Sequence, residues 1–216
     1  MKIGIIGTGI VGRTLAKGFL SLGHDVMLGT RNIAKDEVKK FLSENDRALA
    51  GSFADAAKFG DLIVLTVAGR IAKDAIEMTD KNDYRGKTVI DTTNPISQEP
   101  AVNGVMKFFT GANDSLGEHI QSWLPEANVV KCFNCVGSAF MINGKQFGEN
   151  LPTMFICGNN AEAKKQVTGF LTSFHWETLD CGMIEASRAI EPLCMLWCIP
   201  GFLQNQWAHA FKLLRK

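Results

Sequence analysis

The sequence lacks an excess charge of either sign, a long apolar run and a targeting segment. Its 23 basic and 22 acidic residues leave a net charge of +1, which gives no electrostatic reason to expect a nucleic-acid or membrane partner. The longest apolar stretch, 192–203, is shorter than the roughly 20 residues of a membrane span, and it contains Pro200. The first residues show no basic segment, apolar region and cleavage site in order. We therefore expect a soluble cytoplasmic protein with a small-molecule partner.

The sequence is also poor in residue groups that hold metals or perform thiol chemistry. Its four histidines are isolated from one another, so we expect no metal site. Cys132 and Cys135 have the C-x-x-C spacing but lie on and just after an expected strand, whereas a redox pair of low pKa begins a helix. Cys194 and Cys198 are four residues apart on an apolar helix, which is typical of core packing. The spacing leaves the roles of these four cysteines open.

Strands and helices alternate along the chain, which predicts an α/β fold. We expect a Rossmann-type doubly wound parallel sheet in residues 1–150, followed at 151–216 by a small C-terminal domain, an α+β and helical extension. This extension would supply the acceptor pocket. The expected strands are 2–6, 24–28, 48–51, 61–67, 87–91, 128–133, 153–158 and 176–180, and the expected helices are 13–22, 36–44, 53–59, 72–79, 115–124 and 161–173.

The C-terminal third is the most apolar part of the chain. The pattern predicts a helix over 184–197, a break at Pro200 and Gly201, and a final amphipathic helix over 204–214. This apolar surface fits a homodimer interface, and equally a cover for the edge of the chain's own sheet. The segment 98–113 has no clear periodicity and is expected to form a loop over the site.

A glycine-rich turn follows the first strand. Gly7, Gly9 and Gly12 form G-x-G-x-x-G between a strand and a helix, the context that a dinucleotide site requires. The first glycine permits the tight turn, the second lets the backbone approach a pyrophosphate, and the third allows close packing of helix on strand. The helix N-terminus attracts phosphate. We therefore expect Gly7, Thr8, Gly9, Ile10, Val11 and Gly12 to bind the cofactor.

Arg31 indicates which dinucleotide binds. NAD sites carry an acidic residue at the end of the second strand, where it accepts hydrogen bonds from the ribose. Here the strand is followed by Thr30, Arg31 and Asn32, with Lys35 close by and no acid in the turn. An arginine fork and hydroxyl or amide donors suit a 2′-phosphate. The sequence therefore predicts NADP(H), the alternative being that Arg31 is a solvated loop residue.

Three further strand exits are expected at the site, because ligands collect at the carboxyl ends of strands in such sheets. Small and polar residues occupy these exits, although they are also ordinary turn formers. No typical acid–base pair for carbonyl reduction is recognisable there, which favours hydride transfer between two cofactor rings. We expect cofactor contacts from Thr66, Val67, Ala68, Thr93, Asn94 and Pro95, and acceptor-side candidates at Asn134 and Cys135, with the catalytic residues otherwise unassigned.

Five segments occur together in order along nearly the whole chain: 5–9, 28–32, 91–95, 129–134 and 189–193. Together they resemble the NADP oxidoreductase family that depends on coenzyme F420, a deazaflavin. The N-terminal reductase domain of the six-transmembrane epithelial antigen metalloreductases, which uses a flavin, is similar in the same segments. Two departures from the family are Cys135, where the family more often has threonine, and the cysteine- and proline-rich stretch 194–202.

The resemblance implies a commonly dimeric enzyme that transfers a hydride between NADPH and a deazaflavin or flavin-like acceptor such as FMN or FAD. Among the nucleotide residues, it carries over Thr8, Gly9, Ile10, Val11, Thr30, Arg31, Lys35 and Asn94. Two alternatives stay open: a small imine or carbonyl reductase resembling pyrroline-carboxylate reductase, and an NADP(H)-sensing dimer without turnover. The first is disfavoured by the strands expected near Thr153 and Trp176, because that family has an all-helical C-terminal domain.

Overall fold

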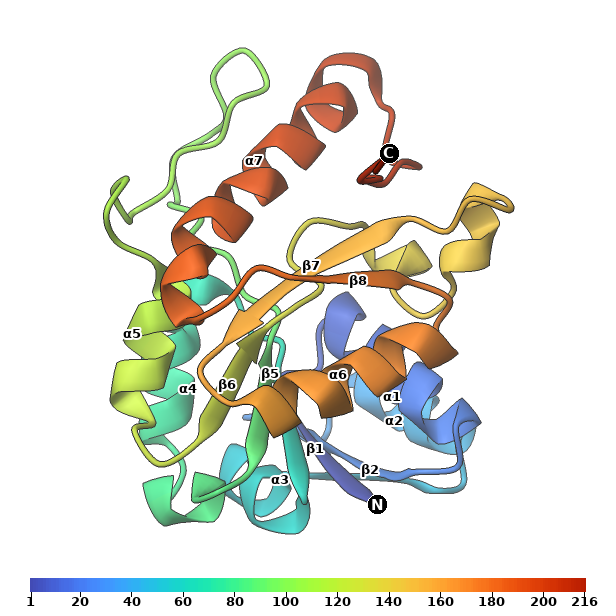
Figure 1. Cartoon of the computed structure of the whole chain (residues 1–216). Coiled ribbons are helices and arrows are strands. Elements are labelled where there is room, and N and C mark those ends of the chain that lie inside the picture. The colour runs from blue at the N-terminus through green and yellow to red at the C-terminus, as the bar shows by residue number, and fades with distance from the viewer.

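One eight-stranded sheet runs through the whole molecule, in the order β3-β2-β1-β4-β5-β6-β7-β8 (Figure 1). The computed structural model describes all residues from 1 to 216. The strands are β1 (Lys2–Ile6), β2 (Asp25–Gly29), β3 (Ala48–Gly51), β4 (Leu62–Leu65), β5 (Thr88–Asp91), β6 (Asn128–Lys131), β7 (Thr153–Gly158) and β8 (Glu177–Asp180).

The first six strands are all parallel to one another, as a doubly wound sheet requires. The chain builds β2 and β3 on one side of β1 and then continues on the other side with β4. The strand order therefore reverses at β1, where the carboxyl ends of β1 and β4 open a crevice for ligands. The predicted Rossmann-type architecture is confirmed.

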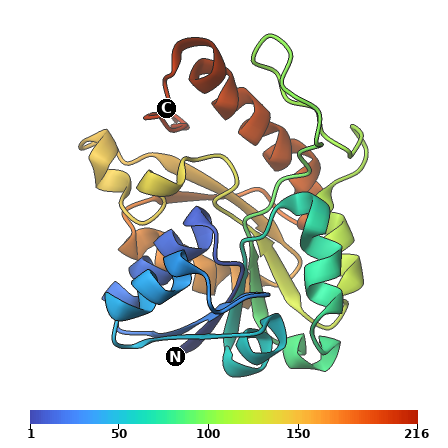
Figure 2. The same ribbon diagram turned by 180° about the vertical axis from the view of Figure 1, so that it is seen from behind.

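Six of the seven α-helices cover the two faces of this sheet, and α7 lies beyond the ends of its strands (Figure 2). Leu15 and Phe19 of the first helix pack on one face together with Phe170. Ala56, Ile76 and Ile120 form the core of the opposite face. The helices are α1 (Ile10–Ser21), α2 (Asp36–Ser43), α3 (Phe53–Phe59), α4 (Ala72–Glu77), α5 (Leu116–Trp123), α6 (Ala161–Ser173) and α7 (Ser187–Gln204).

The C-terminal segment continues the same sheet. β7 runs antiparallel to β6, with Val130 opposite Gly158 and Lys131 opposite Cys157. β8 is parallel to β7 and forms the outer edge. The strands expected near Thr153 and Trp176 are therefore confirmed. β7 and β8 belong to the same sheet as the first six strands, so the sheet does not mark a domain boundary at residue 150. The division into two domains there stays a prediction.

The predicted break at Pro200 and Gly201 is wrong. α7 is continuous from Ser187 to Gln204, although it contains Pro192 and Pro200. A proline inside a helix costs about 3 kcal/mol, but the burial of Trp197 and Cys198 on the inner face of α7 offsets that cost. None of the helices, α7 included, combines the length and hydropathy needed to cross a membrane.

The predicted final helix over 204–214 is also wrong. Asn205 adopts the left-handed conformation with φ of 54° and ends α7. The following tail is not helical and makes its hydrogen bonds to other elements. The Phe211 carbonyl accepts from Thr153 N at 2.8 Å, and Leu213 N donates to Thr153 Oγ1 at 3.1 Å. These partners on β7 are invisible to a local sequence pattern, which explains the error.

The loop between β5 and α5 leans against α7. It is pinned by isolated antiparallel bridges between Ile96 and Phe108 and between Val102 and Val105. At its tip, a Cβ added to Gly104 would lie 2.9 Å from Leu203 Cγ, which shows how closely the tip approaches α7. The loop and α7 lie together beyond the carboxyl ends of the first six strands (Figure 1).

Candidate functional site

The turn between β1 and α1 provides an open cradle. Gly7 has φ of 122°, a conformation that favours glycine. A Cβ on Gly12 would lie 2.3 Å from the Gly7 carbonyl oxygen, so only glycine lets α1 pack this close to the turn. A Cβ on Gly9 would meet nothing within 4 Å. No side chain caps the N-terminus of α1, so its first N–H groups remain available to an anion.

The second strand ends in a turn that presents positive charge. Thr30 Oγ1 accepts from Asn32 N at 3.2 Å, which fixes the turn and leaves Arg31 exposed on its outside. Lys35 is also exposed, and its Nζ lies 4.0 Å from the nearest oxygen of Glu37. At this distance the ion pair is weak, so both cations can face an incoming phosphate.

A cavity of about 510 Å³ joins the glycine turn to this cationic turn. Phe53 and Ile71, which we did not predict, form apolar walls. Phe53 could have been inferred from the sequence. Ser52 and Asp55 have the spacing of a capping box directly after β3, which places Phe53 at the start of α3 and therefore at the carboxyl end of the sheet. The cavity brings together ten predicted residues: Gly7, Thr8, Gly9, Thr30, Arg31, Asn32, Lys35, Thr66, Val67 and Ala68.

The remaining predicted cofactor residues lie outside this lining. Ile10, Val11 and Gly12 form the first turn of α1 directly behind the cradle. Thr93, Asn94 and Pro95 follow β5 one strand further along the sheet. The cradle, the two cations and the absence of an acid from the cavity lining fit an NADP phosphate end.

The exits of β5 and β6 meet through two asparagines. Asn94 Nδ2 donates to the Asn134 carbonyl at 2.8 Å, and Asn134 Nδ2 donates to Asn94 Oδ1 at 3.2 Å. Asn134 Nδ2 also donates to the Ile190 carbonyl of α7 at 2.9 Å. Asn134 Oδ1 is buried and has no partner within the chain. A buried acceptor without a partner is uncommon in a folded protein, which marks Asn134 as a candidate ligand-binding residue.

Cys135 packs in this region and is not a reactive thiol. Its side chain is buried, and burial raises the pKa of the Cys135 thiol to about 12. Burial likewise raises the pKa of the Cys132 thiol well above its usual range. All six cysteines of the chain are free. No group of three or more histidine, cysteine, aspartate or glutamate side chains has the arrangement of a metal site.

A buried ion cluster lies directly behind these exits, where the sequence indicated no recognisable acid–base pair. Lys131 Nζ lies 2.6 Å from Asp91 Oδ2 and 2.8 Å from Glu191 Oε1. It also donates to the Thr93 carbonyl at 2.9 Å. Asp91 and Lys131 could have been noticed in the sequence, because each is a single charged residue in an otherwise mostly apolar strand. The register of β5 and β6 places the two residues opposite each other. The contribution of Glu191 from α7 could not be inferred locally.

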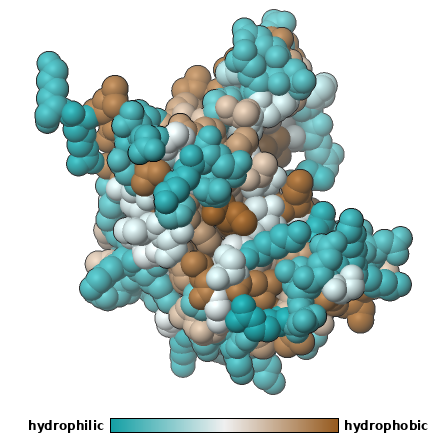
Figure 3. Space-filling model, turned by 90° about the vertical axis from the view of Figure 1, so that its right-hand side faces the viewer, coloured by the Kyte–Doolittle hydropathy of each residue, from teal (hydrophilic) through white to brown (hydrophobic).

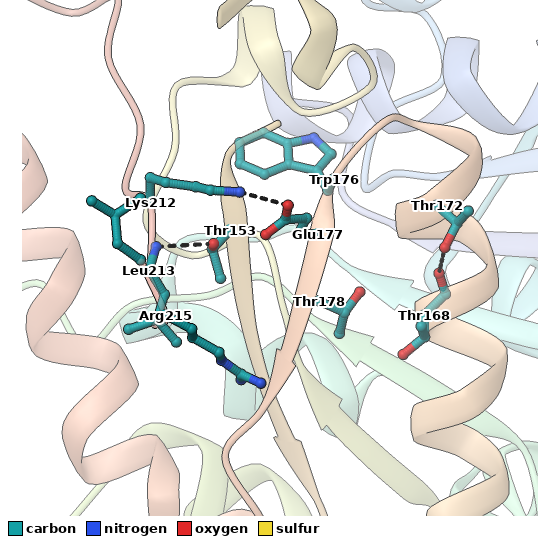
Figure 4. A pocket seen from close by; sticks show the side chains of 10 residues that line it. Thr153, Thr168, Thr172, Trp176, Glu177, Thr178, Lys212, Leu213 and Arg215 are labelled. Carbon is teal, nitrogen blue, oxygen red and sulfur yellow. Dashed lines mark hydrogen bonds and ion pairs between the residues drawn. The ribbon is translucent and has the colours of Figure 1, made fainter. Parts of the chain in front are cut away.

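A larger cavity of about 670 Å³ lies elsewhere, between β8, α6 and the C-terminal tail (Figure 4). Its polar groups are mostly engaged within the chain. Lys212 Nζ lies 2.6 Å from Glu177 Oε1, and Thr172 Oγ1 donates to the Thr168 carbonyl at 2.9 Å. It shares no lining residue with the nucleotide cavity. The contacts of Lys212 with Glu177 and of Leu213 with Thr153 tie the tail to β8 and β7.

Comparison with known proteins agrees with this geometry. The family model described as NADP oxidoreductase, coenzyme F420-dependent, matches residues 2–95. A solved structure from Arthrobacter sp. FB24, described as a candidate F420-dependent NADP reductase, is 31% identical, with a TM-score of 0.93 and full coverage of both chains. The imine reductase of Streptomyces aurantiacus shares the fold at 13% identity, with a TM-score of 0.66 over 94% of this chain and 63% of that chain.

Two curated relatives extend the comparison. The F420-dependent NADP reductase of Methanothermobacter thermautotrophicus is 25% identical over 214 residues, which cover 91% of this chain and 87% of that protein. Metalloreductase STEAP3 of Rattus norvegicus is 27% identical over 206 residues, covering 94% of this chain. The chain spans only 39% of that metalloreductase.

Proposed function

The chain belongs to the NADP oxidoreductase family that depends on coenzyme F420, and we propose that it transfers a hydride between NADP(H) and a deazaflavin or flavin-like ring. It is an NADP-dependent oxidoreductase by that membership. The observation that carries the proposal is the single cavity in which an open glycine cradle meets Arg31 and Lys35. One end of the cavity offers N–H groups to a pyrophosphate and the other end offers two cations to a 2′-phosphate, as the binding of NADP(H) requires.

In this proposal the cradle and the turn after β2 hold the two phosphate ends. The N–H groups at the start of α1 bind the pyrophosphate, while Arg31 forks onto the 2′-phosphate and Lys35 adds a point charge. Thr30 and Asn32 keep the turn in shape through their own hydrogen bonds. When bound, the nicotinamide ring supplies or receives the hydride.

The exits of β5 and β6 would orient the reacting end. Asn134 Oδ1 is the buried acceptor without a partner that we assign to the carboxamide N–H, and Asn94 fixes the Asn134 side chain. Pro95 and the apolar face of α7 keep water away from the ring. No side chain needs to move a proton in a transfer of this kind between two rings, so positioning is the chain's main contribution.

We place the acceptor between the exit of β6 and α7. A cavity of about 290 Å³ lies between α7 and the loop after β5, where Met106, Phe108, Pro192 and Met195 are among its lining residues. Figure 3, which views the molecule from the right-hand side of Figure 1, shows apolar atoms at the surface between polar ones. An apolar surface suits a flat ring, and the rim supplies polar groups to its edges. The family description names coenzyme F420, and the likeness to a metalloreductase keeps FMN and FAD among the acceptors to be measured.

We further propose a homodimer located in the cytoplasm. Leu196, Phe202 and Leu203 are exposed along the outer side of α7. Together with Val102 and Phe109 of the neighbouring loop, they form an apolar patch of the kind that a second copy covers.

The experiment that tests the function is anaerobic oxidation of NADPH with deazaflavin, with FMN, with FAD and without acceptor. We expect rapid oxidation with one of the ring acceptors and none without acceptor. Tight NADPH binding with no oxidation by any ring would overturn the proposal and favour an imine substrate or a sensor. Size-exclusion chromatography with NADPH and with NADP would then separate these two, because a sensor changes its assembly between the two ligands.

A further inference from the structure

Three ionic side chains with almost no exposure to solvent are enclosed at the centre of the proposed site. Asp91 and Lys131 are fully buried and Glu191 is 1% exposed. Removing three charges from water is expensive, and the same space could hold apolar side chains at no cost in stability. A cluster of this kind therefore calls for an explanation beyond packing.

Lys131 is not available as an acid or base. Its ammonium group has three N–H donors, and the three partners already described, Asp91, Glu191 and the Thr93 carbonyl, take all of them. Burial opposes the charge, but the two carboxylates outweigh it and raise the pKa of Lys131 above its ordinary value. Lys131 therefore remains a permanent cation that holds its three partners.

Those partners belong to elements that line the two sides of the site. Asp91 Oδ1 accepts from Thr93 N at 2.8 Å and from Thr93 Oγ1 at 2.7 Å, which fixes the loop that leads to Asn94. Glu191 belongs to α7, on the acceptor side. The cluster is thus the direct ionic link between the loop of the nicotinamide end and the helix of the acceptor end.

Glu191 also anchors α7 to a third element. Its carboxylate accepts from Leu116 N at 3.0 Å and from Gly117 N at 2.8 Å, the first N–H groups of α5. The next donor, Glu118 N, is taken by Ser115 Oγ at 3.2 Å. A carboxylate at a helix N-terminus is stabilised by these N–H groups and by the helix dipole. Both oxygens of Glu191 are therefore committed.

We propose that Lys131 and Glu191 are positioning residues that set the distance between the Thr93–Asn94 loop and α7, and hence between the two reacting rings. This inference rests on the proposed function. It adds that the rate of hydride transfer depends on residues that touch neither ring. A displacement of about 1 Å in such a site can reduce a rate by roughly 100-fold.

The test compares Glu191→Gln and Glu191→Asp with the wild-type chain. Glutamine keeps the size but turns one acceptor into a donor facing Lys131 Nζ or the N–H groups of α5, and aspartate keeps the charge but is one methylene too short. We expect the single-turnover rate with saturating NADPH and acceptor to fall at least tenfold in both. The NADPH dissociation constant should stay within twofold, because the phosphate end is untouched. Glu126→Gln is the matched control, since it removes an exposed ion pair with Arg85 far from the site.

Hydrogen exchange provides a readout that does not depend on activity. In the wild type, Leu116 N and Gly117 N should be protected even though first-turn amides usually exchange fast. In either variant, peptides covering 115–118 and 187–193 should exchange at least tenfold faster, and in Glu126→Gln they should not change.

The possible outcomes separate this inference from the proposed function. If the wild-type chain fails to oxidise NADPH with every ring acceptor tested, the proposed function is refuted. Hydrogen exchange still decides in that case whether the cluster holds α7. Rates within twofold of wild type in a folded variant overturn the positioning role. Unchanged exchange in both variants, or unprotected Leu116 and Gly117 amides in the wild type, overturns it as well, and the last result needs no variant to fold.

Discussion

On the nucleotide side of the site, the proposed phosphate-binding groups come from two short stretches of sequence, and Gly9, Arg31 and Lys35 among them are exposed. Gly7 to Gly12 and Thr30 to Lys35 each follow a strand directly, and Arg31 is exposed. On the α7 side, the polar groups come from three distant segments and are buried, as Asp91, Lys131 and Glu191 are. The nucleotide side presents positive charge that an anionic ligand can neutralise. On the α7 side, Lys131 already neutralises one of the two buried carboxylate charges.

This difference predicts where a substitution affects binding and where it affects the fold. An exposed cation contributes little to stability until an anion arrives, so its removal is felt in affinity. A buried cation is paired in the free protein, so its removal leaves carboxylates uncompensated and is felt in stability. The following variants examine the two regions separately.

The largest effect is expected from Lys131→Met. Two buried carboxylates would lose their counter-charge, and the free energy of unfolding should fall by about 3 to 5 kcal/mol. Denaturant unfolding monitored by tryptophan fluorescence measures this change. Lys73→Met is the matched control, because Lys73 Nζ lies 3.8 Å from Glu77 Oε1 on the surface of α4. That variant should lose less than about 1 kcal/mol. Equal losses in the two variants would contradict the contrast between the regions.

Arg31→Asp should have the next largest effect, on affinity rather than stability. It removes a phosphate contact and adds repulsion, so NADPH binding should weaken by about 2 kcal/mol or more, roughly 30-fold. Titration of NADPH fluorescence measures the dissociation constant, and NADH should be affected less. Lys165→Asp makes a similar change in charge at an exposed position of α6 and should leave the affinity unchanged. An unchanged NADPH dissociation constant in Arg31→Asp would refute the assignment of Arg31.

The two regions also differ in how far the sequence predicts them. The nucleotide side depends on local rules, in which a strand exit, glycine spacing and a cationic turn fix the geometry within a few residues. The strands and helices from β1 to α6 were predicted to within a few residues for the same reason, because their apolar periodicity is local.

The α7 side depends on contacts between distant segments. Glu191 resembles any charged residue in a helix until α5 and β6 are placed beside it. The continuity of α7 through Pro200 follows from burial against the core, and the tail stays extended because β7 offers it hydrogen-bond partners. Propensity rules for proline breaks and amphipathic helices contain neither fact, so these predictions were wrong.

Gly9→Ala should show a smaller effect that isolates the cradle. The added methyl group would meet nothing within 4 Å in the free chain, so the free energy of unfolding should fall by no more than about 1 kcal/mol, the cost of alanine instead of glycine at the N-cap of α1. It would occupy space that the pyrophosphate needs, and NADPH binding should weaken by about 1 kcal/mol, roughly fivefold. Gly169→Ala is the control, because its methyl group also meets nothing within 4 Å and lies on α6. Equal NADPH affinity in the two variants would show that the cradle does not hold the cofactor.

The smallest effect concerns the thiols, and it tests how closed the α7 side is. Cys181 is exposed at the end of β8, whereas Cys132, Cys135 and Cys194 are buried. Burial raises the pKa of Cys135 to about 12 and also shields the thiol from reagents. Titration of the native protein with a thiol-specific disulfide reagent at pH 8 should therefore show one fast thiol per chain, and Cys181→Ser should abolish it. A second fast thiol that NADPH or an acceptor ring protects would place an accessible cysteine beside the ligands. In that case the exit of β6 would be open in the free protein, and the contrast between an open nucleotide side and a closed α7 side would fail.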